Sequence, residues 1–264
     1  MIKKARGFTL IELVVVIVLL GIMAVTFTRL IINSVQGYID TSNRQDSAAM
    51  ARIALDRIAR DLREAMPQSI RTSSNGNGNC IQFLPINSSF VYTTFSSANT
   101  VVSVVEPPGG AVVPGSGFYA AVNPINSDDL YSTVAMKAIN NFGSVSSGLR
   151  NITLTSGFAA PRSGPGERLY VVGNPISYCF TNNQLLRYTS AVSVTQPIPG
   201  SGLSNGAIML DKLPLTAAAP SSFTYGSGNW QNNALVTIML TIQQASSNNE
   251  QLQLDHEVWL RNVQ

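Results

Sequence analysis

His256 is the only histidine of the chain, and acidic residues flank it on both sides, Asp255 and Glu257. An imidazole beside two carboxylates can transfer protons or bind a metal ion. The surrounding residues are typical of a β-strand, in which successive side chains point to opposite faces. We therefore expect the two carboxylates on one face and His256 on the other, where they share neither a proton nor a metal. No nucleophile elbow accompanies the histidine, so we expect no enzymatic activity, no cofactor and no metal site.

The remaining polar motifs are weak evidence for a ligand. Two glycine-rich segments, GPGE from Gly164 and GSGLSNG from Gly200, lack the spacing of phosphate-binding loops and are typical of surface turns. Asp128 and Asp129 are adjacent acids without the ordered series of oxygen ligands found in calcium loops. A solvated loop is the simpler interpretation of this pair.

The charge distribution gives no support for nucleic-acid binding. The chain carries a net charge of +3, and three of its 17 bases lie within the first seven residues. The rest of the chain holds 14 bases against 14 acids, which leaves it neutral overall. Charged residues make up 12% of the chain, below the roughly 25% of soluble domains, which favours an exported and loop-rich β-domain.

One carboxylate, Glu12, lies in an otherwise apolar stretch from Phe8 to Thr28, in which 14 residues are Leu, Ile, Val or Phe. As a helix this stretch is about 30 Å long, which matches the hydrocarbon core of a bilayer. The insertion free energy of the apolar side chains outweighs the cost of one acid, about 2.5 to 3.5 kcal/mol. The sequence thus predicts a membrane-spanning helix, in which an acid usually has a partner.

Lys3, Lys4 and Arg6 precede the apolar stretch, which predicts a cytoplasmic amino terminus and a single pass, with the bulk of the chain exported. A secretory signal peptide begins similarly, but no convincing small-x-small cleavage site follows, and simple signals avoid an internal acid. A plain uncleaved anchor is a further alternative, although it leaves Glu12 unexplained. For Glu12 alone, the alternative to a role in assembly is snorkelling to the membrane interface.

The segment KKARGFTLIELVVVIVLLGI resembles the leader and first helix of type IV prepilins and pseudopilins. The resemblance implies that a prepilin peptidase cleaves between Gly7 and Phe8 and then methylates the amino group of Phe8. It also implies that Glu12 pairs with the positive amino terminus of a neighbouring subunit during filament assembly. Many major pilins have a proline at the position of Arg29, whereas this chain has none before Pro67, which weakens an interpretation as a bulk filament subunit.

The helical periodicity continues as far as Pro67, which ends the helix at or just before it. Acids and bases four residues apart, such as Asp40 with Arg44 and Asp56 with Arg60, predict ion pairs on the solvated face. This stretch resembles the stalk of larger minor pilins of the MshO and PilW type and of J-type pseudopilins. The predicted apolar stripe consists of Ala48, Ala51, Leu55, Ile58, Leu62 and Ala65.

Short β-like segments separated by turn residues follow, and the expected fold class is α+β, a long helix packed on an antiparallel sheet. Asn182 and Asn183 predict a tight hairpin, and ALVTIMLTIQQ is expected to pair with LDHEVWLRN around a turn at residues 246–249. The expected organisation is a leader at 1–7, a transmembrane and assembly helix at 8–32, an amphipathic stalk helix at 33–66 and an exported β-rich domain at 67–264.

Cys80 and Cys179 are the only cysteines, and both are expected outside the cytoplasmic membrane, where disulfides persist. We expect a disulfide, which would close about 100 residues and stabilise the fold by roughly 4 to 5 kcal/mol. The alternatives are two separate buried thiols or a metal pair, and two cysteines with one distant histidine make a poor metal site.

The sequence is compatible with three candidate functions. The first is a minor pilin that helps to initiate, cap or prime a type IV-like pilus. The second is a minor pseudopilin at the tip of a type II secretion pseudopilus. The third is a tip adhesin, with contacts near Tyr119 and Tyr131. The resemblance implies as partners a prepilin peptidase/methyltransferase, other minor and major pilins and an inner-membrane assembly platform. The expected location is the inner membrane with a periplasmic domain, and the pilus tip after assembly.

Overall fold

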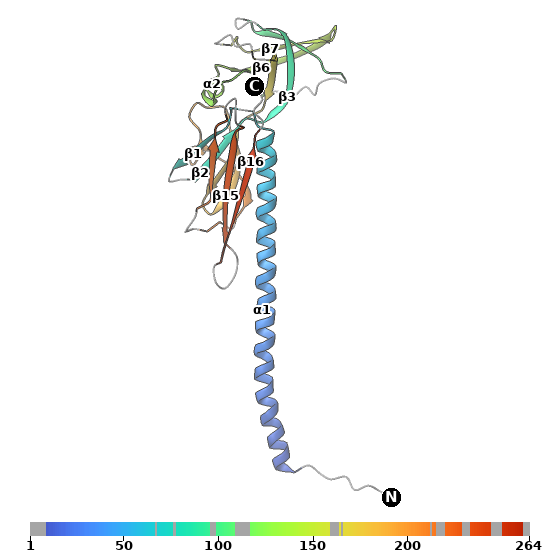
Figure 1. Cartoon of the computed structure of the whole chain (residues 1–264), viewed down its shortest axis with the longest axis vertical. Coiled ribbons are helices and arrows are strands. Elements are labelled where there is room, and N and C mark those ends of the chain that lie inside the picture. The colour runs from blue at the N-terminus through green and yellow to red at the C-terminus, as the bar shows by residue number, and fades with distance from the viewer. Residues whose placement is uncertain are drawn as a thin grey trace.

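The computed structural model describes residues 9–66, 68–75, 78–95, 99–108, 117–158, 164, 166–211, 213–214, 220–228, 233–243 and 250–260. Its dominant element is a 54-residue helix, α1 (Leu10–Arg63), which carries the globular domain on its carboxyl-terminal half (Figure 1). At 1.5 Å per residue the helix is about 81 Å long. Every side chain from Thr9 to Ile39 is exposed, so the amino-terminal half has no contact with the domain that would cover it.

The two ends of α1 have clear local causes. Thr9 is the N-cap, and its side-chain oxygen accepts a hydrogen bond from the Glu12 N–H. The helix ends at Arg63, three residues earlier than the Met66 end expected from the sequence. The residue before a proline is disfavoured in a helix, and here the Met66 N–H instead donates to the Leu84 carbonyl at 2.7 Å. The chain has therefore left the helix before it reaches Pro67.

The strands of the globular domain are β1 (Arg71–Asn75), β2 (Gly78–Phe83), β3 (Ile86–Thr94), β4 (Val101–Val105), β5 (Tyr119–Val122), β6 (Met136–Ser146), β7 (Leu149–Leu154), β8 (Arg168–Val172), β9 (Ile176–Thr181), β10 (Gln184–Thr189), β11 (Ile198–Pro199), β12 (Gly202–Leu203), β13 (Ala207–Leu210), β14 (Ser222–Gly226), β15 (Leu235–Gln243) and β16 (Gln251–Trp259). A short helix, α2 (Ser127–Tyr131), lies between β5 and β6.

Two antiparallel sheets pack against the carboxyl-terminal half of α1. One has the strand order β1-β2-β9-β10-β13 and the other β14-β15-β16. Their inner faces share one hydrophobic core with the buried face of the helix, in which Ile58 and Leu62 of α1 meet Tyr178 of β9 and Leu240 of β15. The protein therefore has the α+β, pilin-like fold expected from the sequence.

The expected strand pairings in this region are confirmed. β9 and β10 form a hairpin across Asn182 and Asn183, whose φ angles of 49° and 62° suit a turn of type I′. β15 pairs with β16 over nine residues, from Leu235 opposite Trp259 to Gln243 opposite Gln251. The turn expected at residues 246–249 lies outside the described residues.

A closed six-stranded barrel is inserted in the chain between β2 and β9. Its strand order is β3-β4-β7-β6-β5-β8, and it has a core of its own that includes Phe90, Val104, Ile152 and Val171. Its labelled strands β3, β6 and β7 lie at the end of the molecule remote from the amino terminus (Figure 1). Four of its strands, β3, β4, β7 and β8, match β-like segments that the sequence indicates, FVYTTF from Phe90, TVVSVV from Thr100, ITLT from Ile152 and RLYVV from Arg168. Neither β5 nor β6 nor the closure into a barrel was expected.

Buried polar contacts join the barrel region to the five-stranded sheet. The Arg71 guanidinium of β1 lies 3.5 Å from the centroid of the Tyr131 ring of α2. The Tyr131 hydroxyl donates to the Ser69 carbonyl at 3.0 Å, and burial raises the pKa of this phenol. Tyr131 is therefore an internal contact and not part of an adhesive surface, and Tyr119 is half-buried within β5.

Candidate functional site

Glu12 lies in the first turn of α1, where the positive end of the helix dipole favours a carboxylate. Its side chain is exposed, and no cation among the described residues pairs with it. The neighbouring residues Leu10, Ile11 and Leu13 are also exposed, at 81%, 68% and 56%. Gly7 and Phe8, the residues of the expected cleavage and methylation site, lie outside the described residues. Glu12 is thus an open acid at the beginning of a bare apolar surface.

By length and composition, α1 is the one helix among the described residues that is able to cross a membrane. Its polar side chains are compatible with that environment. The hydroxyls of Thr28 and Ser34 donate to carbonyls one turn earlier, both at 2.8 Å, and the Thr26 hydroxyl does the same to Met23. Hydroxyls satisfied within their own helix remove most of the cost of placing them in hydrocarbon.

The other half of α1 is fixed to the sheets by the stripe that the sequence indicated. Ala51, Leu55, Ile58 and Leu62 are at most 5% exposed, Ala65 is 8% exposed, and Ala48 is half-buried. Small side chains at residues 51, 54 and 59 allow the strands to approach the helix axis closely. The domain therefore holds one end of the helix firmly while the other end projects freely.

Two charged residues of the helix, Arg44 and Asp61, bind residues of the sheets and not other residues of the helix. Arg44 pairs with Glu250, at the beginning of β16. Asp61 accepts a hydrogen bond from the Tyr178 hydroxyl at 2.7 Å and pairs with Arg187 at 3.4 Å. The ion pairs expected within the helix are therefore wrong for Arg44. The sheet supplies a partner that sequence spacing does not reveal, and Asp56 forms no ion pair with Arg60.

Cys80 and Cys179 form a disulfide across the neighbouring strands β2 and β9, where they face each other in register. Both cysteines are fully buried and pack with Leu186, Tyr188 and Leu203. The bond closes 99 residues of sequence, a segment that contains the whole barrel. It joins β2, the strand that precedes the barrel in the chain, to β9, the strand that follows it.

His256 points toward the core side of β16, and Asp255 and Glu257 point outward, as the alternation predicted. The Nε2 atom of His256 is buried and has no hydrogen-bond partner in the part of the chain that the structure describes. Among the described residues, no three of His, Cys, Asp and Glu gather in a group that could hold a metal ion.

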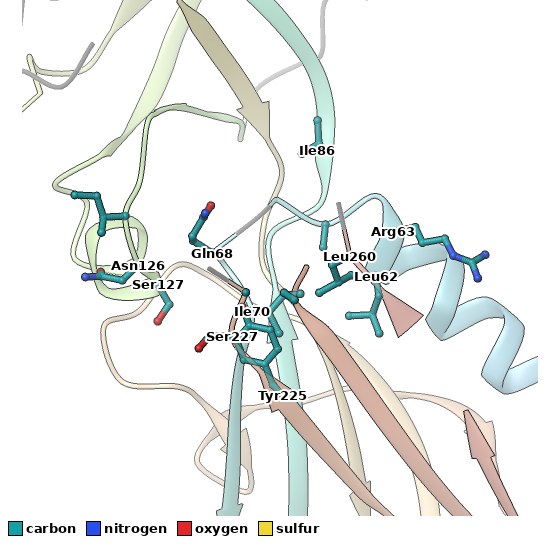
Figure 2. Close-up of a pocket in the computed structure, with 14 residues that line it drawn as sticks. Leu62, Arg63, Gln68, Ile70, Ile86, Asn126, Ser127, Tyr225, Ser227 and Leu260 are labelled. Atoms are coloured by element: carbon teal, nitrogen blue, oxygen red, sulfur yellow. The ribbon is translucent and has the colours of Figure 1, made fainter. Parts of the chain in front are cut away.

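A cavity of about 260 Å³ lies where the end of α1 meets the three-stranded sheet and the segment before α2. Figure 2 shows Leu62 and Leu260 on one side, Ser127 and Ser227 on the other, and the Tyr225 ring between them. The Arg63 guanidinium points away from this group (Figure 2). The cavity is mainly apolar with a few hydroxyls, which is typical of a cavity that binds a small molecule. Sequence patterns do not reveal this cavity, because its lining comes from six separate segments of the chain.

Residues 2–28 match a family model described as the prokaryotic N-terminal methylation motif. The motif supports a type IV pilin-like protein. No curated protein and no solved structure matches the chain. Proteins with this motif are structural rather than catalytic, and the motif implies processing by a prepilin peptidase and assembly with other pilins. A single apolar amino-terminal helix is consistent with membrane anchoring of this pilin-like chain.

Proposed function

We propose that the protein is a minor pilin, a structural subunit that helps to initiate, cap or prime a type IV-like pilus after removal of its leader. The observation that carries this proposal is the exposed Glu12 at the start of the bare apolar half of α1. A domain fixed only to the other half of the helix leaves about 45 Å of helix exposed, from Leu10 to Ile39. The otherwise apolar part, as far as Thr28, is available to a membrane and then to other helices.

The chemistry of assembly follows from the charge of Glu12. Cleavage between Gly7 and Phe8 creates a new amino terminus on Phe8, which N-methylation leaves positively charged. A carboxylate in hydrocarbon is stabilised best beside a cation, and the amino terminus of a neighbouring subunit provides one at matching depth. Before cleavage the Phe8 nitrogen is an uncharged peptide amide, so the cation that Glu12 needs exists only after the leader has been removed.

The basic leader places the amino terminus in the cytoplasm and the domain in the periplasm, with the chain in the inner membrane until assembly. Its partners are then the prepilin peptidase/methyltransferase, the assembly platform of the inner membrane and other minor and major pilins. The barrel supports a minor and terminal position, because it adds bulk at the end of the molecule remote from the membrane (Figure 1).

A tip adhesin is a second candidate function. The barrel favours it, because the barrel has a hydrophobic core of its own and lies at the end of the molecule remote from the amino terminus. A minor pseudopilin of a type II secretion system shares the amino-terminal motif and the long helix. Deletion of the gene separates the three functions. Loss of pili supports assembly, intact pili with lost attachment support adhesion, and intact pili with lost secretion support a pseudopilus.

Replacement of Glu12 by Val tests the assembly role. We expect the variant to insert in the membrane and to lose its leader normally, but to be absent from sheared pili, or to leave cells without pili. Thr28→Val, in the same exposed helix, is the matched control and should assemble normally. Normal incorporation of the Glu12 variant would refute the proposed pairing.

A further inference from the structure

The outer face of β16 carries an exposed tryptophan beside two acids. Trp259 is 62% exposed, and Asp255 and Glu257 point to the same side of the strand. Neither carboxylate pairs with a cation among the described residues, and the Gln253 side-chain amide donates a hydrogen bond to Asp255 at 3.3 Å. We call Asp255, Glu257 and Trp259 the acidic sheet face. The opposite side of β16 packs in the core through Val258.

The exposed side of α1 carries the complementary charges. Ile53 is 68% exposed, and Arg57 and Arg60 are exposed beside it without an ion-pair partner among the described residues. With Asp56 and Asp61 these residues line a shallow, open recess of about 430 Å³. Asp61 is already bound to Tyr178 and Arg187 of the sheet, so the two arginines face one remaining acid, Asp56, and the recess keeps a net positive charge. We call Ile53, Arg57 and Arg60 the basic helix face. Ile53 is an exposed apolar side chain one turn before Arg57 and two turns before Arg60 on the same side of α1, a combination that suits an indole ring through burial and cation–π contact.

The two faces point in opposite directions on one molecule. At 100° per residue, Ile53, Arg57 and Arg60 lie across the helix from the stripe of Leu55, Ile58 and Leu62 that packs on the sheets. The acidic sheet face lies on the far side of the sheet from that stripe. Copies related by a sideways shift alone would therefore bring the acidic face of one against the basic face of the next.

The two faces also lie at the same height along the molecule. Arg44 pairs with Glu250 at one end of β16, and Leu62 and Leu260 line the same cavity at the other. Glu257 is about 23 Å from Glu250 along the strand, and Arg57 is about 20 Å from Arg44 along the helix. In two copies whose helices are parallel and anchored at the same membrane depth, Glu257 of one copy therefore lies at the same height as Arg57 of the other.

We propose that two copies of this chain associate side by side, with the acidic sheet face of one copy docked on the basic helix face of the next. Trp259 enters the recess over Ile53, and Glu257 pairs with the Arg57 and Arg60 guanidinium groups. The arrangement rests on the membrane anchoring assumed in the proposed function, which keeps the copies parallel. It is a heterologous contact, so the second copy keeps an open face for a further subunit.

The test is photocrosslinking of the full chain in membranes, with p-benzoyl-phenylalanine at Gln253, on the rim of the acidic sheet face. We expect a dimer whose crosslinked peptide comes from α1. Glu257→Arg and Arg57→Glu should each lower the yield at least about tenfold, as like charges then face each other. The double variant should restore it, because the opposite charges meet again. Asp211→Arg, with the same change of charge at an exposed site elsewhere, should crosslink normally.

Trp259→Ala is expected to lower the dimer yield about tenfold or more, as for other central tryptophan contacts. The mobility of each variant on a non-reducing gel checks that the native disulfide has formed. Absence of the dimer in the wild type, a crosslink to a different protein, or a double variant as weak as the single ones would overturn the proposal. Leader removal and pilus assembly report on the proposed function separately, since they remain measurable whether or not the dimer forms.

Discussion

Removal of the disulfide between β2 and β9 should destabilise the globular domain strongly, because the bond closes a segment that includes the entire barrel. In the chain-entropy model, a closed loop of 99 residues corresponds to about 4.7 kcal/mol of stabilisation at 25 °C. Both cysteines are fully buried, so a pair of alanines is preferable to serines, which would bury two hydroxyl groups. For Cys80→Ala with Cys179→Ala we expect a loss of about 4 to 5 kcal/mol in the free energy of unfolding.

Guanidinium denaturation of the full chain in detergent, followed by far-UV circular dichroism, measures this loss, because the β-strand signal disappears as the sheets packed against α1 unfold. Thr72→Ala, at an exposed position of β1, is the control and should change the stability by less than about 0.5 kcal/mol. A loss below about 1 kcal/mol in the double alanine variant would refute the claim that closing this 99-residue segment stabilises the domain strongly.

Three further results are expected. Tyr178→Phe should lower the free energy of unfolding by about 1 to 2 kcal/mol, because Asp61 then loses a 2.7 Å hydrogen bond. Denaturation in urea or guanidinium measures this change, and an unchanged midpoint would contradict the contact. Glu106→Gln should destabilise the barrel by about 2 to 3 kcal/mol, since both carboxylate oxygens of Glu106 accept hydrogen bonds from Arg150, at 2.7 and 2.8 Å. Faster hydrogen exchange of the backbone amides in β4 and β7 would show this loss. Unchanged protection of these amides would refute the prediction. Burial raises the pKa of Tyr131 and of Tyr178, so their protonated forms stabilise the fold below pH 10, and this contribution is lost as the pH rises above 10. Absorbance at 295 nm should show both phenols ionising only as the domain unfolds. Ionisation of either phenol before unfolding would count against its burial.

The parts of the fold that sequence reasoning could predict are those in which a local pattern decides the structure. The spacing of Ala51, Leu55, Ile58 and Leu62 fixes the buried side of α1, and alternation fixes the side of β16 on which His256 lies. The Asn182–Asn183 hairpin follows in the same way from residues that tolerate a positive φ.

The barrel was not predictable because its closure depends on pairings between distant strands. β6 pairs with β5 and β7, and register shifts interrupt its pairing with β7, so the regular alternation that marks a strand is lost. The partner of Arg44 was missed for a related reason. Spacing within a helix favoured Asp40, whereas the fold brings Glu250, about 200 residues away, to the same place.

Mass spectrometry of the intact chain and its amino-terminal peptide, purified from the membranes of its native host, measures whether the leader has been removed. A pilin-like assembly subunit should begin at Phe8 with a methylated amino group, which places a cation four residues before Glu12. A chain that still carries Met1 to Gly7 would contradict this, and would make α1 a plain membrane anchor.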